Sequence, residues 1–150
     1  MTREEQAVET FAKGFNCAQS VLSAFSEDFG LDKILAFKMT NGLGGGVRCG
    51  EVCGALNGGA MVVGLNCGYF DEKDLEQKGF CNNKTYEFIE RFKEENGSML
   101  CREILGMDIR VPTDFTRPEV RERHDSVCPK IVASAVRILE SMEFESGSQG

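Results

Sequence analysis

Four of the seven cysteines in this chain stand where helices are predicted to begin. They are Cys17, Cys53, Cys101 and Cys128. A helix start offers unpaired N–H groups and the positive end of the helix dipole, and both stabilise a thiolate. The thiolate is the form of cysteine that attacks disulfides and binds metals. We therefore regard these four residues as candidate catalytic residues or, alternatively, as metal ligands. If their helices pack as a bundle, the sulfurs would converge on one pocket.

A plainer interpretation is that these cysteines are small buried hydrophobic residues, as cysteine often is. Four such placements beside a glycine-rich segment favour a functional role. Cys67 and Cys81 have no such placement, and we expect them to be structural or incidental. Cys49 would share a face with Cys53 only if the helix of Cys53 extended back by one turn.

Other motifs that carry chemistry are missing from the sequence. There is no C-x-x-C of a thioredoxin-like site or zinc ribbon, and no C-x-x-C-H for covalent haem. The glycines at 42–50 fit neither the phosphate loop nor the dinucleotide fingerprint. His124 is expected at the surface, although a position four residues before Cys128 would also suit a base or a ligand.

The composition excludes several classes of partner. A formal net charge of −7 without a basic cluster argues against nucleic-acid binding. The longest apolar stretch, at 60–65, is too short to span a bilayer, so we expect no membrane insertion. No signal-peptide pattern opens the chain, which predicts a cytoplasmic protein. Seven cysteines, an odd number, are then better explained as reactive, metal-binding or buried thiols than as a disulfide framework.

The elements that must position the cysteines are predicted as helices. Three amphipathic helices are expected near 2–14, 16–30 and from 32 to the glycines at 42, with Thr2, Asn16 and Asp32 as caps. No alternating strand pattern is found, which predicts an all-α fold. We expect one helical domain over 1–145, built from about six or seven helices, followed by a solvated tail at 146–150.

The stretch 42–68 holds ten of the seventeen glycines and three of the seven cysteines. Within it, 51–64 is apolar nearly all round, which predicts a buried central helix. Glycines four residues apart give this glycine-rich helix a smooth face for close packing against another helix. That face would also suit a homodimer.

The second half of the chain is predicted with less regular elements. A helix is expected over 83–96 and a short one over 99–105 capped by Ser98, while 69–82 and 106–117 are expected to be connections. Pro118 would begin a helical turn. The last helix is expected to start at Pro129, because proline suits the first helical position, and Cys128 would be its N-cap.

The chain resembles the C_GCAxxG_C_C family of redox-active proteins over nearly its whole length, in the order and spacing of five segments. The segments are NCAQSV (16–21), GGG (44–46), CGALNG (53–58), CREIL (101–105) and CP (128–129). The family's four invariant cysteines map onto Cys17, Cys53, Cys101 and Cys128. The resemblance extends to a domain of split-Soret cytochrome c, a haem protein associated with an iron–sulfur centre. Haem is not expected here, because the attachment motif is missing.

Three hypotheses follow. In the first, at least two of the four cysteines cycle between thiol and disulfide with an unidentified redox partner, and Cys53 is the preferred nucleophile because glycines leave its surroundings open. In the second, the four sulfurs bind an iron–sulfur cluster or zinc. In the third, the chain is a structural or interaction module with inert cysteines.

Overall fold

Helices account for nearly all of the regular structure. The computed structural model describes residues 1–145, so the predicted tail at 146–150 lies outside the described residues. Within 1–145 the chain forms seven α-helices and no strand, which confirms the all-α prediction. They are α1 (Arg3–Ala12), α2 (Cys17–Ser26), α3 (Lys33–Thr40), α4 (Gly54–Cys67), α5 (Leu75–Asn96), α6 (Cys101–Leu105) and α7 (Pro118–Ser141).

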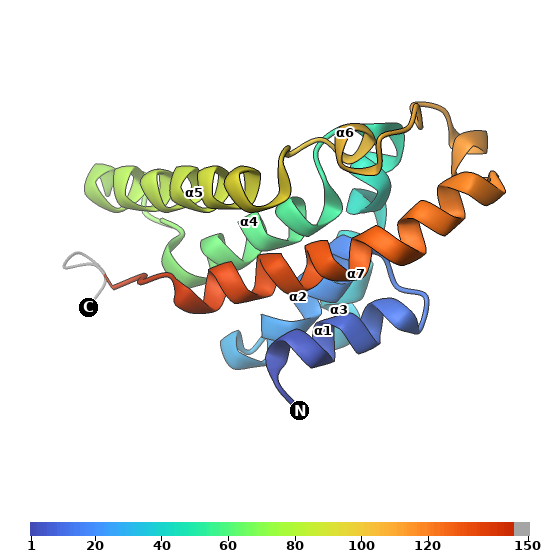
Figure 1. The fold of residues 1–150 in the computed structure, drawn as a ribbon. Helices are drawn as coiled ribbons and strands as arrows, with labels where there is room; N and C mark the ends of the chain where they lie inside the picture. The colour runs from blue at the N-terminus through green and yellow to red at the C-terminus, as the bar shows by residue number, and fades with distance from the viewer. Residues whose placement is uncertain (146–150) are drawn as a thin grey trace.

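The long helix α7 crosses the molecule, with α1 and α2 on one side and α4 and α5 on the other (Figure 1). α4 in turn packs against α2 and α5. The core between these helices is apolar, and Phe88, Phe92 and Val132 are fully buried in it. None of the helices within 1–145 is long and apolar enough to cross a membrane.

The three predicted caps at the start of the chain are confirmed. The side chains of Thr2, Asn16 and Asp32 each accept a hydrogen bond from a backbone N–H three residues later. These bonds satisfy donors that a helix start would otherwise leave unpaired. The α1–α2–α3 region is therefore defined by local sequence signals.

Two helices differ from the prediction in where they begin. α5 begins at Leu75 rather than at residue 83, because Asp74 caps it by accepting a hydrogen bond from the Gln77 N–H at 3.0 Å. The predicted connection at 69–82 is therefore partly wrong, and Gly79 and Cys81 are helical. α4 begins at Gly54, three residues later than predicted.

The last helix is the largest departure. α7 begins at Pro118 and continues through Pro129, so the predicted start at Pro129 is wrong. Proline inside a helix removes the hydrogen bond to the carbonyl four residues earlier. That carbonyl belongs to Asp125, an exposed residue, so water can satisfy it. The apolar stripe on both sides of Pro129 is buried from Val120 to Leu139, which keeps the helix continuous.

Candidate functional site: a cavity lined by four cysteines

Cys17 is the first residue of α2, and a capping box fixes the turn that carries it. The Asn16 Oδ1 accepts a hydrogen bond from the Gln19 N–H at 2.9 Å, and Gln19 Oε1 accepts one from the Asn16 N–H at 2.9 Å. The Asn16 amide also donates to the Asn41 carbonyl at 3.0 Å, which ties this turn to the end of α3. The position of Cys17 is therefore set by its own helix and by the next one.

A short antiparallel bridge places Cys53 beside Cys101. The Cys53 N–H donates to the Met99 carbonyl at 2.8 Å, and the Cys101 N–H donates to the Glu51 carbonyl at 2.7 Å. After the bridge each of the two segments continues into a helix. Cys53 is the N-cap of α4, and Cys101 is the first residue of α6. Both cysteines therefore stand at helix starts, as predicted.

Cys128 does not stand at a helix start. It lies well inside α7, and its predicted role as an N-cap is wrong because the helix begins at Pro118. The N–H groups around it are engaged in the helix, so the dipole argument does not apply to this thiol. The Cys128 side chain is nevertheless buried, and it is the neighbour that raises the pKa of the Cys17 thiol most.

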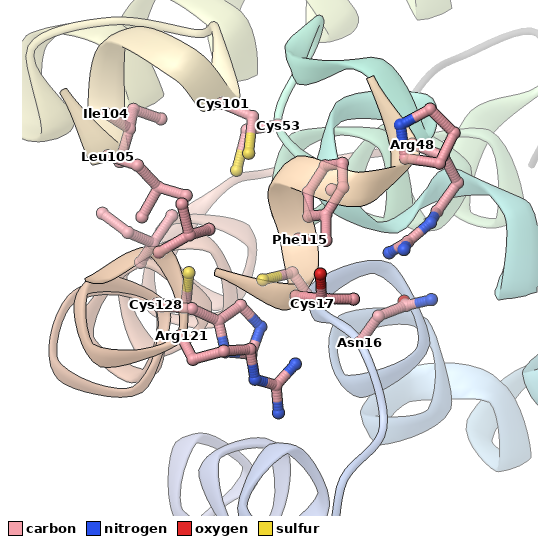
Figure 2. A pocket seen from close by; sticks show the side chains of 17 residues that line it. Asn16, Cys17, Arg48, Cys53, Cys101, Ile104, Leu105, Phe115, Arg121 and Cys128 are labelled. Carbon is pink, nitrogen blue, oxygen red and sulfur yellow. The ribbon is translucent and has the colours of Figure 1, made fainter. Parts of the chain in front are cut away.

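The four sulfurs line one cavity of about 230 Å³ where α2, α4, α6 and α7 meet. Figure 2 shows the side chains of Cys17, Cys53, Cys101 and Cys128 around this cavity. Each of the four side chains is 5–8% exposed. The sequence could not show whether the four cysteines come together, and the fold places all of them around one cavity.

Apolar side chains complete the wall around the sulfurs. Ile104, Leu105, Phe115, Val120 and Ile131 all line the cavity. They come from α6, from the turn at Pro112–Thr116 and from α7. This surrounding excludes water from the thiols, which penalises the charged thiolate form.

Cationic and polar side chains also reach the cavity, and most of them belong to no motif that can be recognised in the sequence. Arg48, Arg121 and His124 line it together with Asn16, and the same four residues border a neighbouring hollow. His124 and Arg121 precede Cys128 by one and two turns of α7. The spacing of His124 from Cys128 is visible in the sequence, whereas that of Arg121 has a meaning only once the helix is known to start at Pro118. Arg48 is not part of any motif identified in the sequence.

The loop that presents Arg48 has an unusual backbone. Val47 and Arg48 have positive φ values of 57° and 60°, in the left-handed region that non-glycine residues rarely occupy. Each such residue costs on the order of 1–3 kcal/mol. The Arg48 guanidinium stacks 4.4 Å from the centroid of the Phe115 ring, which holds it at the cavity.

Cys49 lies just outside the cavity. It is half-buried in the same turn, and its Sγ donates to the Gly46 carbonyl at 3.5 Å. Because α4 begins only at Gly54, Cys49 does not share a helix face with Cys53. It is not among the residues that line the cavity.

The cavity depends on close backbone contact between α2 and α4. A Cβ atom added at Gly58 would lie 2.6 Å from the carbonyl oxygen of Ala18, the residue that follows Cys17. A Cβ at Gly54 would lie 3.1–3.2 Å from backbone atoms of Leu43 and Ala18. Two glycines of the CGALNG segment therefore allow the two cysteine-bearing helices to approach each other.

The thiols of Cys53 and Cys101 are held in their protonated form. Burial raises the pKa of Cys53 to about 11, although the N–H groups of Ala55 and Leu56 donate to its sulfur and oppose the shift. Burial raises the pKa of Cys101 to about 12, and the charges of Cys53 and Cys128 add to the effect while Arg48 opposes it. The helix start therefore lowers the pKa of Cys53 less than burial raises it.

The pKa of Cys17 is raised as well, first by its hydrogen bond with Cys128 and then by burial. The nearby sulfurs of Cys53 and Cys101 add a smaller repulsion. The expectation that these helix starts carry resting thiolates is therefore wrong for Cys17, Cys53 and Cys101. The reason is that all four sulfurs share one apolar cavity, where charge is penalised by desolvation and by the neighbouring sulfurs.

The donor set is that of a Cys₄ metal centre, since thiolates are the usual ligands of zinc and iron–sulfur clusters. The geometry does not fit one, because no three His, Cys, Asp or Glu side chains within 1–145 are grouped as a metal site would require. The four sulfurs line one cavity, but within 1–145 they are not grouped closely enough around one point to hold an ion.

Comparison with protein-family models gives a match that covers most of the chain. Residues 15–142 match the family described as "Putative redox-active protein (C_GCAxxG_C_C)". The chain belongs to this family. The match begins just before Cys17 and ends after Cys128, so it spans the four cavity cysteines. Searches among curated proteins and among solved structures found no match.

Proposed function

We propose that the cavity is a thiol–disulfide redox site whose working pair is Cys17 and Cys128. The observation that carries this proposal is that both thiols line one cavity, where Cys128 has the largest effect on the pKa of Cys17. Two thiols that face each other across a small cavity can form a disulfide with little movement of the backbone. The family's description as a redox-active protein supports the same kind of chemistry.

Cys128 is the proposed nucleophile and Cys17 the resolving cysteine. The hydrogen bond raises the pKa of Cys17, so Cys17 keeps its proton while its partner attacks. This assignment replaces Cys53 as the preferred nucleophile, because burial raises the pKa of Cys53 to about 11. His124 is the proposed proton acceptor, since it lines the same cavity one turn before Cys128.

The exchange conserves atoms and electrons. The Cys128 thiol gives its proton to His124, and its sulfur attacks one sulfur of a substrate disulfide. The S–S bond breaks, and the first substrate thiol leaves with the proton returned by His124. Cys17 then attacks Cys128 Sγ in the mixed disulfide, and the second substrate thiol leaves with the proton of Cys17. The protein pair loses two electrons, and the substrate disulfide gains them.

Cys53 and Cys101 would act as a second pair in the same cavity. The backbone hydrogen bonds of the bridge bring the two residues together, and both influence the pKa of Cys17 electrostatically. An intramolecular exchange could move the disulfide from Cys17–Cys128 to Cys53–Cys101, since each attack breaks one S–S bond as it forms another. The raised pKa values of Cys53 and Cys101 would make this transfer slower than the first exchange.

The substrate class follows from the size and charge of the cavity. A volume of about 230 Å³ admits a small disulfide better than the surface of a folded protein. Arg48 and Arg121 at its wall favour a reagent that carries carboxylates. We therefore expect a low-molecular-weight anionic disulfide to be a better substrate than a cationic one of the same size.

A stoichiometric assay tests the proposal. The reduced protein is mixed with an anionic aromatic disulfide, and the released coloured thiol is counted over the fast phase. Relative to the reference chain, Cys17→Ala should release one equivalent fewer and Cys128→Ala two fewer. All of these chains, the reference included, carry Cys49→Ala, because Cys49 lies outside the cavity and, as the one cysteine that is not buried, would itself react with the reagent. Full release at an unchanged rate by Cys128→Ala would overturn the proposal.

A further inference from the structure

We propose that Cys67 and Cys81 form a second dithiol, separate from the cavity, that oxidises to a disulfide joining α4 to α5. The Cys67 Sγ lies 2.9 Å from the Cys81 Sγ. Neither residue lines the cavity of the four cysteines. We expected both to be structural or incidental because neither stands at a predicted helix start, and neither does so in the structure.

The two sulfurs are brought together by regular structure. Cys67 is the last residue of α4, and Cys81 lies in the second turn of α5. The Gln77 side chain donates to the Cys67 carbonyl at 2.7 Å, and the Thr85 hydroxyl donates to the Cys81 carbonyl at 3.0 Å. Both backbones are thus held by hydrogen bonds, and the sulfurs meet without help from a mobile loop.

The sulfur separation decides what chemistry the pair can do. A disulfide bond is about 2.05 Å long, so closing it from 2.9 Å requires a shift of less than 1 Å. Small side-chain rotations suffice for such a shift. Two sulfurs alone do not make a metal site, and no larger group of ligands within 1–145 surrounds them. Oxidation is therefore the reaction that this geometry favours.

Exposure and pKa determine which of the two cysteines is oxidised first. Cys67 is 1% exposed and Cys81 is 8% exposed, so an oxidant in solution reaches Cys81 first. Burial and the hydrogen bond with Cys81 raise the pKa of Cys67 to about 12, although the nearby charge of Lys84 opposes the shift. Cys81 is therefore the attacking thiol and Cys67 the resolving one.

Hydrogen peroxide is the oxidant class for which we write the reaction, because it is small enough to reach a nearly buried thiol. The Cys81 thiolate attacks one peroxide oxygen, the O–O bond breaks, and a sulfenic acid and water form. Cys67 then attacks the sulfenic sulfur and releases a second water. The two thiols lose two electrons and two protons in all, and one peroxide becomes two waters.

The new disulfide would stabilise the packing of α4 against α5. The two cysteines are 14 positions apart, so the disulfide closes a short loop and restricts the unfolded chain. A loop of this length predicts a rise in Tm of roughly 10 °C. Oxidation would thus stabilise one side of the bundle without changing the four cavity cysteines.

The test uses the full chain treated with hydrogen peroxide in excess of its thiols, followed by alkylation, tryptic digestion and mass spectrometry. Cleavage after Lys73 and Lys78 separates the two cysteines, so the bond appears as a link between the peptides 49–73 and 79–84. Because 49–73 also carries Cys49 and Cys53, the link must disappear in Cys67→Ala and persist in Cys49→Ala.

The expected result is this link together with the higher Tm, both reversed by a dithiol reductant. Cys81→Ser provides a second variant that should show neither the link nor the Tm shift. A Cys17→Ala/Cys128→Ala double variant should keep both, which separates this pair from the cavity. Recovery of Cys67 and Cys81 as free thiols after complete oxidation of Cys49, or over-oxidation of Cys81 without a link, would overturn the proposal.

Discussion

Replacing Gly58 by alanine probes the contact that brings α2 and α4 together. The added Cβ would lie 2.6 Å from the Ala18 carbonyl oxygen and 3.1 Å from its Cα. These are backbone atoms, so they cannot move aside as the end of a flexible side chain would. The substitution must push α2 away from α4, and the first residue of α2 is Cys17.

The expected cost is a balance of two terms. Alanine stabilises a helix by about 1 kcal/mol relative to glycine at the same position. Over-packing a close helix contact costs about 1–3 kcal/mol. Gly64, in the same helix, has no atom within 4 Å of an added Cβ, so Gly64→Ala keeps the first term and avoids the second. The free energy of unfolding of Gly58→Ala should therefore lie about 1–3 kcal/mol below that of Gly64→Ala.

Urea unfolding followed by circular dichroism measures this difference directly. Gly64→Ala should be more stable than the unsubstituted chain, and Gly58→Ala should be less stable than Gly64→Ala. Gly58→Ala should also slow the fast thiol release, because the displacement of α2 moves Cys17. Equal stability of the two variants would refute the close-packing argument.

Three further perturbations have defined outcomes. Asn16→Ala removes the capping box of α2 and should lower the free energy of unfolding by about 1 kcal/mol, whereas an unchanged value would show that the cap is not needed. Val47→Gly relieves a left-handed backbone conformation and should stabilise the protein by about 1 kcal/mol in the same urea experiment, and a loss of stability would contradict the strain argument. The third concerns pH. Because burial raises the pKa of Cys53 from 9.0 to about 11, the unfolded chain loses this proton first, and Cys53 alone should lower the free energy of unfolding between these pH values by about 1.4 kcal/mol per pH unit. Cys53→Ala should show a shallower fall over that range, and an identical slope would mean that Cys53 does not contribute.

Much of the fold was readable in local sequence signals. Thr2, Asn16 and Asp32 are capping residues whose partners lie three positions away, so the first three helices could be placed from the sequence. The start of α5 was missed although Asp74 caps it by the same rule, because Gly79 and several charges obscured the helical pattern.

Pro129 misled the prediction of α7. Proline is common at the first turn of a helix, and the sequence alone cannot show that buried residues on both sides keep the helix intact. This error also affected the predicted site, because it placed Cys128 at the start of a helix, whereas Cys128 lies inside α7. The cysteine itself was nevertheless correctly placed among the residues that meet at the cavity.

Other features of the site depend on contacts between distant segments. The bridge that joins Cys53 to Cys101 is a single antiparallel pair, which is too short to produce an alternating pattern. The raised thiol pKa values arise from shared burial, which only the packed structure reveals. The contact between Cys67 and Cys81 likewise requires that α4 and α5 be known to pack together.

The most direct test of the central proposal is to identify the first disulfide that forms in the cavity. The reduced protein is mixed with a substoichiometric amount of an anionic small disulfide, quenched in acid, alkylated and mapped by mass spectrometry. The account predicts a bond between Cys17 and Cys128 before any bond that involves Cys53 or Cys101. A first bond between Cys53 and Cys101, or no intramolecular bond among the four, would contradict it.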